Sequence, residues 1–266
     1  MRGRYIWAVA LVLVGLWLLL GNIGWLPGAS WGIFWSLVLI VAGVVLILEA
    51  ARRGRQVGPV DDTVPLGTAV RGKLTVKHGA GRLVIQGVEG PGYLAWGTFG
   101  GGVHKTINTI DDVIEAELSM DVGVVADRVA SLSKRNKAYE WNVAVNSAVP
   151  LDLNLDTGVS DQHLDLSRTH ITKFNLNTGA SSTVLILPKA AGFTEARINS
   201  GAASVKITVP QGVSLRVTGA MGLGSLKVDE NRFPKTTDGY ESPDFQTAAN
   251  RVYLTIEGGV GSVEIR

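Results

Sequence analysis

The feature that most constrains this chain is an N-terminal run, Tyr5 to Leu48, that contains no Asp, Glu, Lys, Arg or His. A helix needs about 20 apolar residues to cross a hydrocarbon core about 30 Å thick. The run is interrupted once, by Asn22–Gly28, where Pro27 removes a backbone donor and the glycines tolerate positive φ angles. Residues 1–51 are therefore predicted to form a transmembrane helical hairpin with two spans.

Basic residues flank both ends of this predicted hairpin, while the connecting turn is uncharged. Arg2 and Arg4 precede the first span, and Arg52, Arg53 and Arg55 follow the second. Because lysine and arginine favour the cytoplasmic side of a membrane, both ends are predicted to face the cytoplasm. The expected location is the cytoplasmic (inner) membrane, with the C-terminal domain inside the cell.

A secretory signal peptide is the competing interpretation of the N-terminus. Residues 1–4 would be its basic region and residues 5–20 its apolar core. No Ala-x-Ala cleavage site follows this core, and a second apolar run does. The hairpin is therefore favoured.

The composition of the remaining chain excludes several kinds of site. Residues 57–266 contain 20 basic and 22 acidic residues, a balance of −2. Nucleic-acid binding rests largely on phosphate neutralisation, so a near-neutral body with no basic stripe argues against it. The chain has no cysteine, which excludes disulfides and thiolate metal sites.

The second half of the chain contains a repeat in which each unit has the form strand, glycine turn, strand. Its first three glycines, Gly158, Gly179 and Gly201, are 21 and 22 residues apart, and apolar and polar residues alternate on both sides of each. A fixed period of this kind predicts stacked β units that bury one face against their neighbours. We expect a linker over 52–64 and a β-solenoid-like repeat domain over 65–266.

Further units are less regular. Residues 73–85 have the same strand, glycine, strand form, and residues 139–145 are predicted to form a strand. At the C-terminal end, a less regular unit is expected at 215–228 and a last unit at 254–265. Asp229–Asn250 is polar, carries two prolines and is expected to be a loop inserted between these last two units. Such insertions often carry binding function, although a plain surface excursion is commoner.

Within the repeat, Asp156, Asn177 and Asn199 recur two residues before each glycine. Stacking is expected to align them at successive units. Because Asn and Asp bond their own backbone and tolerate turn conformations, we expect them to serve the turns.

Two segments imitate known binding loops. Gly97–Thr106 is rich in glycine, but His104 stands where a phosphate loop needs glycine directly before Lys-Thr, so a glycine-rich hairpin or bulge is favoured. Residues 152–158 resemble the start of a calcium loop. The alternating leucines, the late glycine and His163 in place of a bidentate glutamate argue against calcium.

No catalytic, cofactor-binding or metal-binding residue is predicted, and we expect no enzyme activity. Asp111 and Asp112 are adjacent and would point to opposite faces of a strand. Ser181 and Ser182 have neither a nucleophile-elbow context nor a convincing base partner. The histidines are too scattered for a zinc motif and are expected to be solvated: His78, His104, His163 and His170.

The chain resembles a bacterial family. Residues 15–27 and 35–43 look like the transmembrane module of LiaI-LiaF-like proteins, although Trp35 is followed by Ser36 where the family usually has proline. The repeat over 149–209 is similar to the toast-rack β-repeats of LiaF-like C-terminal domains and putative adhesins. The resemblance implies a membrane-tethered, non-enzymatic protein of the cell-envelope stress response that restrains a membrane histidine kinase, and it transfers no binding residue.

Two hypotheses for function follow. In the first, the protein is a regulator whose hairpin packs in the lipid bilayer against the helices of a sensor kinase, with Gly15, Gly21 and Gly43 permitting close approach. In the second, the β domain is a scaffold or adhesin-like surface that forms homo-oligomers through its terminal strands. Val263–Arg266 is then the expected uncovered edge.

Overall fold

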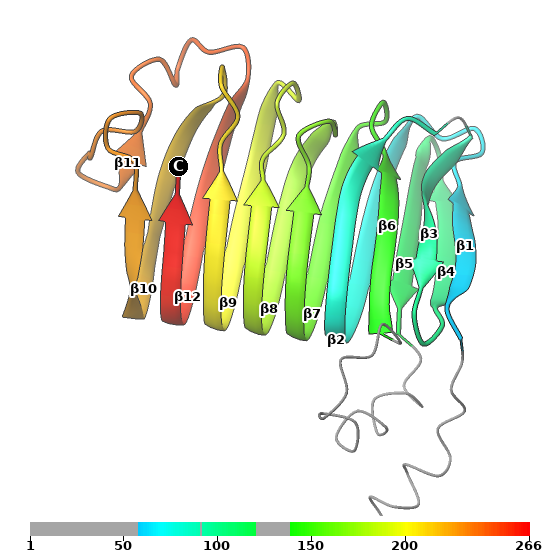
Figure 1. Ribbon diagram of the computed structural model, residues 1–266. Helices are drawn as coiled ribbons and strands as arrows, with labels where there is room; N and C mark the ends of the chain where they lie inside the picture. Colours follow the sequence, from blue (N-terminus) through cyan, green and yellow to red (C-terminus); the bar gives the residue numbers. More distant parts are fainter. Residues whose placement is uncertain (1–57, 91, 121–138) are drawn as a thin grey trace, which may run out of the picture. The chain divides into compact units, whose positions relative to one another are not determined.

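The computed structural model describes residues 58–90, 92–120 and 139–266. Within these ranges the secondary-structure elements are all β-strands (Figure 1). The all-β character of the repeat domain is confirmed. The predicted hairpin over 1–51 lies outside the described residues. Among the residues that are described, no helix has the length and apolar character needed to cross a membrane.

Six long strands form the body of the domain, and each bends once near its middle. We call each of them a rung, with a first arm before the bend and a second arm after it. Figure 1 shows the rungs side by side, with all the bends at the same end. The rungs are β2 (Arg71–Val88), β7 (Leu151–Asp165), β8 (Ile171–Ile186), β9 (Phe193–Thr208), β10 (Ser214–Val228) and β12 (Arg251–Ile265).

Neighbouring rungs pair in parallel along both arms, so the arms build two facing sheets. The second-arm sheet has the order β1-β3-β6-β2-β7-β8-β9-β12-β10. The first-arm sheet begins with β4 and β5 beside β2 and ends with β11 beside β10. The shorter strands are β1 (Val60–Pro65), β3 (Tyr93–Phe99), β4 (His104–Ile110), β5 (Val113–Ser119), β6 (Glu140–Asn146) and β11 (Tyr240–Glu241).

The core lies between the two sheets and follows from the alternation in the sequence. Because side chains of a strand point alternately to its two faces, every second residue of each arm faces inward. The registers stack these residues in columns across the rungs. One fully buried column contains Leu74, Leu153, Phe174, Ala196, Leu254 and Val217.

A glycine column at the bends allows the rungs to stack closely. A Cβ atom added to Gly179 would lie 2.8 Å from the carbonyl oxygen of Gly158, and one added to Gly201 would lie 2.8 Å from that of Gly179. Real Cβ atoms essentially never come so close to another heavy atom. The recurring glycine of the repeat is therefore required by contact between rungs.

The order of the last rungs in the sheet differs from their order along the chain. β12 lies between β9 and β10, so the final two units do not stack in sequence order. Val263 and Ile265 of β12 are each 1% exposed, whereas the second arm of β10 carries Gly222 and Gly224 and is largely exposed. The two units have the same number of glycines and the same alternation on the second arm, so local pattern does not distinguish the interior unit from the end unit. Because β12 lies between two rungs, Val263–Arg266 is not an uncovered edge.

The segment Asp229–Asn250 is the crossover that permits this exchange. It contains β11, which pairs antiparallel with Arg216 and Val217 of β10. Phe233, also from this segment, is 1% exposed and joins the core. The predicted inserted loop thus caps the end of the first-arm sheet.

The opposite end of the domain is closed by the shorter strands. Trp141 is fully buried, packs edge-on against Phe99 and donates a hydrogen bond from Nε1 to the carbonyl oxygen of Gly100. The strand predicted at 139–145 is confirmed as β6. β1 begins at Val60, so the end of the segment predicted as a linker over 52–64 is a strand.

Candidate functional site

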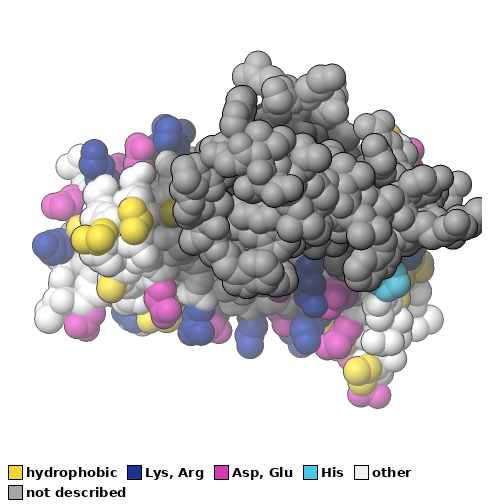
Figure 2. Space-filling view, turned by 90° about the horizontal axis from the view of Figure 1, so that it is seen from below, with side chains coloured by type: hydrophobic (Ala, Val, Ile, Leu, Met, Phe, Trp, Pro, Cys, Tyr) yellow, Lys and Arg dark blue, Asp and Glu magenta, His cyan; other side chains and the backbone are white. Residues whose placement is uncertain are grey.

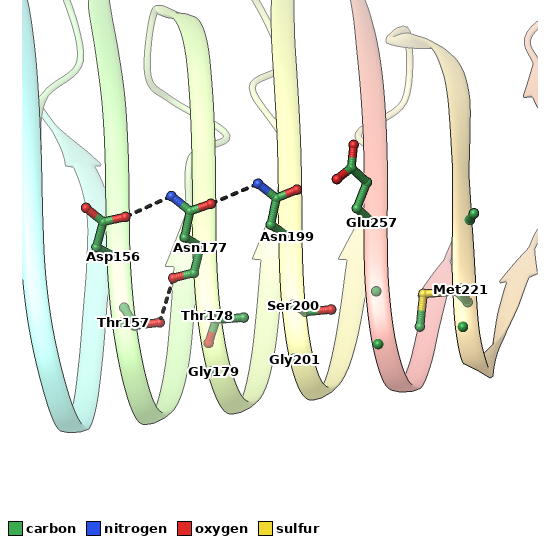
Figure 3. Close-up of a pocket in the computed structure, with 14 residues that line it drawn as sticks. Asp156, Thr157, Asn177, Thr178, Gly179, Asn199, Ser200, Gly201, Met221 and Glu257 are labelled. Carbon is green, nitrogen blue, oxygen red and sulfur yellow. Dashed lines mark hydrogen bonds between the residues drawn. The ribbon is translucent and has the colours of Figure 1, made fainter.

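A ladder of side-chain hydrogen bonds crosses the outer surface beside the bends (Figure 3). Asn177 donates from Nδ2 to Asp156 at 2.8 Å, and Asn199 donates from Nδ2 to Asn177 at 2.9 Å. The predicted alignment of these three residues is confirmed by the registers of β7, β8 and β9. Their expected role is corrected, because they bond one another across rungs.

Asp156 gives this ladder a direction. An ionised carboxylate only accepts hydrogen bonds, so the amide nitrogen of Asn177 must face it, and the same orientation passes to Asn199. The Asn199 Oδ1 atom then points toward Glu257, which stands beside it on β12 (Figure 3). This oxygen is buried and accepts no hydrogen bond from the described residues. The ladder therefore begins and ends next to a carboxylate.

A shallow groove of about 870 Å³ runs along the ladder from β7 to β10. The ladder residues and Glu257 line it together with the glycines of the bends. At the β10 end it is lined by Ala220 and Met221. The groove spans five rungs, and its lining combines amide, carboxylate and hydroxyl groups with a larger apolar surface from the glycines, Ala220 and Met221.

Exposed aliphatic side chains form a second row across the rungs, one residue after each glycine. We call this row the ridge. Val159 is 65% exposed, Val260 53% and Leu223 79%. Figure 2, which views the domain from the bends, shows hydrophobic side chains gathered at the end where β10 lies. The registers align the ridge residues: Ala80, Val159, Ala180, Ala202, Val260 and Leu223.

The residues weighed for chemistry in the sequence do not converge. In the described ranges no group of three or more His, Asp or Glu side chains could hold a metal ion. His104 and His163 are exposed and His170 is half-buried. His78 was expected to be solvated, but it is fully buried and its ring lies 5.3 Å from that of Trp141. This prediction was wrong because His78 lies on the inward face of the β2 bend.

The glycine-rich segment Gly97–Thr106 forms neither a hairpin nor a phosphate loop. It joins β3 in one sheet to β4 in the other, and Gly101 and Gly102 make the corner at φ angles of 80° and 85°. Asp111 and Asp112 form the exposed turn between β4 and β5 and do not lie on a strand.

Ser181 and Ser182 follow the β8 bend and do not line the groove. Ser182 is exposed, and Ser181 lies with its Oγ 3.2 Å from the Thr183 hydroxyl. The calcium-like residues Asp152 and Asn154 lie on the outer face of β7, where Asp152 accepts a hydrogen bond from Thr172 and Asn154 one from Asn175. They serve contacts between rungs.

The ridge was missed by the sequence analysis. Its signal is present in the repeat, since a small or aliphatic residue follows each of Gly158, Gly179 and Gly201. Alternation predicts which strand face is buried, but at a bend the chain changes direction and the rule no longer applies.

Comparisons with known proteins agree with this architecture. The family described as the N-terminal domain of toast_rack, DUF2154, matches residues 54–208. No curated protein matches the chain. A crystal structure of a "putative cell adhesion protein" from Clostridium sporogenes is 21% identical with a TM-score of 0.68, over 78% of this chain and 97% of that one.

A second solved structure, of a "putative adhesin" from Bacteroides fragilis, is 11% identical with a TM-score of 0.26, over 78% of this chain and 96% of that one. The first likeness establishes a shared fold.

Proposed function

We infer the function from the premise that the chain belongs to the toast-rack family. We propose that it is a non-enzymatic, membrane-anchored regulatory protein of the bacterial cell-envelope stress response, and that its β domain acts by binding another protein. The partner proposed is a membrane sensor kinase, with the hairpin of residues 1–51 holding both proteins in the same bilayer.

The observation that carries this proposal is the ridge beside the groove. Contiguous exposed aliphatic side chains on a folded domain mark interaction surfaces. Here Val159 and Val260 stand on rungs that pair with a neighbour on both sides, and Leu223 stands on β10, the last rung. The groove next to them offers amides and hydroxyls for a polar rim, which is the usual composition of a protein interface.

Site-specific photo-crosslinking in a bacterial host tests the proposal. A photoreactive residue is placed at Val159 on the ridge and, as a matched control, at Lys206, which is exposed on the outer face of β9. We expect a membrane histidine kinase to be crosslinked from position 159 and not from 206. The same kinase captured equally from both positions contradicts the proposal.

A scaffold or adhesin-like role is the second candidate, favoured by the uncovered second arm of β10. Crosslinks from position 159 that contain only further copies of the chain would replace the regulator with this role.

A further inference from the structure

Within the part of the chain that the structure describes, the second arm of β10 is the last strand of its sheet. β10 pairs with β12 along its whole length, and β11 covers only Arg216 and Val217 on the first arm. No described strand pairs with the outer side of Met221–Val228. In Figure 1 this arm is the last strand of its sheet.

The backbone of this arm presents unused hydrogen-bonding groups. Asp229 donates to the carbonyl oxygen of Ile265 in β12. In a parallel ladder alternate residues bond to the same neighbour. The odd-numbered residues of the arm therefore face β12, and Gly224, Leu226 and Val228 direct their N–H and C=O groups outward.

The other ends of the two sheets in the described part are protected. β1 carries Asp61, Asp62 and Pro65, and β4 carries Lys105, which are residues that natural edge strands use against pairing. β11 covers the first arm of β10. By contrast, Met221–Val228 contains no proline and a single charge, Lys227.

The core is also open at this edge. Leu226 and Val228 face inward in register with Val263 and Ile265 of β12, which are each 1% exposed. Leu226 and Val228 are half-buried, and no strand within residues 58–90, 92–120 or 139–266 covers them. Another strand added to the edge would bury them.

We propose that this edge is a homodimer interface, at which the second arms of β10 from two copies pair antiparallel about a two-fold axis through Ser225. Gly224 of one copy then lies opposite Leu226 of the other, and Leu223 lies opposite Lys227. The two second-arm sheets become continuous, and the half-exposed side chains of each copy cover the open core of the other.

A second copy fits this edge because the sequence is self-complementary in that register. Each leucine on the inward face meets a glycine, which leaves space for it. Lys227 is the one charge of residues 222–228 and meets Leu223, so no like charges are opposed. Closed two-fold pairing is the commonest symmetry of soluble oligomers. The inference rests on the proposed function of the β domain, which is to bind proteins, and it names a second copy of the chain as one binding partner.

Disulfide trapping tests the interface, since the chain contains no cysteine. The full chain with Ser225→Cys is purified in detergent and oxidised. On the two-fold axis the two Cβ atoms lie about 4.5–5.5 Å apart, within reach of a disulfide after small adjustment.

Ser204→Cys is the matched control, because Ser204, Ser262 and Ser225 share one register column and Ser204 lies two rungs inside. We expect a covalent dimer from Ser225→Cys alone. Equal dimer yields overturn the proposal.

Charge variants test the register. Leu223→Lys places a lysine opposite Lys227 of the second copy and is expected to weaken the dimer about tenfold, whereas Leu223→Glu is expected to retain it. Adding Lys227→Glu to Leu223→Lys restores opposite charges and the dimer. Ile110→Lys removes an exposed aliphatic side chain from β4, at the opposite end of the domain, and leaves the dimer unchanged. Sedimentation of the full chain measures the dimer dissociation constant of each variant.

Equal effects of Leu223→Lys and Leu223→Glu overturn the two-fold register. A kinase crosslinked from position 159 without any dimer at Ser225 overturns this interface and leaves the proposed function standing.

Discussion

At the scale of single residues, the close stacking of the bends depends on glycine, which has no Cβ atom. The glycine column brings the backbone of one rung against the carbonyl oxygen of the preceding one. No rotamer change relieves such a contact, because both partners are backbone. The position tolerates substitution only if the rungs move apart.

Gly179→Ala is therefore expected to destabilise the domain by about 1–3 kcal/mol, as overpacking does elsewhere. The added Cβ would lie 2.8 Å from the Gly158 oxygen. Gly58→Ala is the matched control, because nothing lies within 4 Å of its added Cβ. Urea unfolding measures both, and an equal midpoint for the two variants would contradict the stacking argument.

The ladder predicts a pH-dependent effect. Asn177→Asp removes the amide that donates to Asp156 and puts a second carboxylate beside it. Like charges raise the pKa of a carboxyl group, so the variant is less stable than the parent above the raised pKa and recovers as the pH falls through it. We expect a loss of about 1 kcal/mol at pH 7 that narrows toward pH 4.

Asn250→Asp is the control for this change, since its side-chain oxygen can still accept the hydrogen bond from the Gly192 N–H. A pH-independent loss in Asn177→Asp would mean that the lost hydrogen bond dominates and that the two carboxylates do not interact.

At the scale of elements, the two ends of the domain are closed in different ways. Lys105 on β4 donates to Asp62 on β1 at 2.6 Å and to the carbonyl oxygen of Thr63 at 2.7 Å, which ties the two sheets together. Burial alone would raise the pKa of Asp62. The hydrogen bonds from Lys105 and from the Thr63 N–H, with the charge of Lys105, lower it overall.

Because this pKa is depressed in the folded state, the contribution of Asp62 is present above its unfolded pKa of about 3.9 and is lost as the pH falls through the folded value. Lys105→Met removes the hydrogen bond and the charge that lower this pKa, and leaves the hydrogen bond from the Thr63 N–H in place. We expect the variant to lose about 1 kcal/mol or less at pH 7 and to show a shallower acid limb in thermal unfolding. An unchanged acid limb would mean that the pair contributes nothing to stability.

The other end is closed by the crossover, and Phe233 is its buried anchor at 1% exposure. Phe233→Ala is expected to cost about 3 kcal/mol, because the cavity opens directly onto the core. Phe193→Ala removes a ring that is 48% exposed and serves as the control. Equal losses in urea unfolding would show that the crossover does not cap the core.

The sequence predicts the rungs better than their order. Alternation and the glycine period identify β7, β8 and β9 directly, because each arm of these rungs is long and has one apolar face. The place of β12 depends on a choice between two similar units. That choice is made by long-range burial of Val263 and Ile265, which local pattern does not reveal. The alignment of Asp156, Asn177 and Asn199 follows from the repeat period and was predicted. The ridge and the open edge depend on the bends and on the order of the rungs, and they were not predicted.

At the scale of the whole molecule, the proposed regulator requires the β domain and the cytoplasmic part of a kinase to share one compartment. Basic flanks on both sides of residues 1–51 and an uncharged turn between the spans predict this arrangement. The ridge and the β10 edge could then serve partners held in the same bilayer, where tethering raises their effective concentration.

Reporter fusions test this topology. A reporter active only in the cytoplasm, fused after Arg266, is expected to be active, and one active only outside is expected to be active when fused after Gly28 in the predicted turn. Replacing Arg52, Arg53 and Arg55 by glutamine weakens the cytoplasmic bias of the second flank and is expected to reduce the first signal. An external signal from the Arg266 fusion would contradict the hairpin, remove the kinase from reach of the ridge and favour the adhesin-like role, in which β10 pairing would join copies at the cell surface.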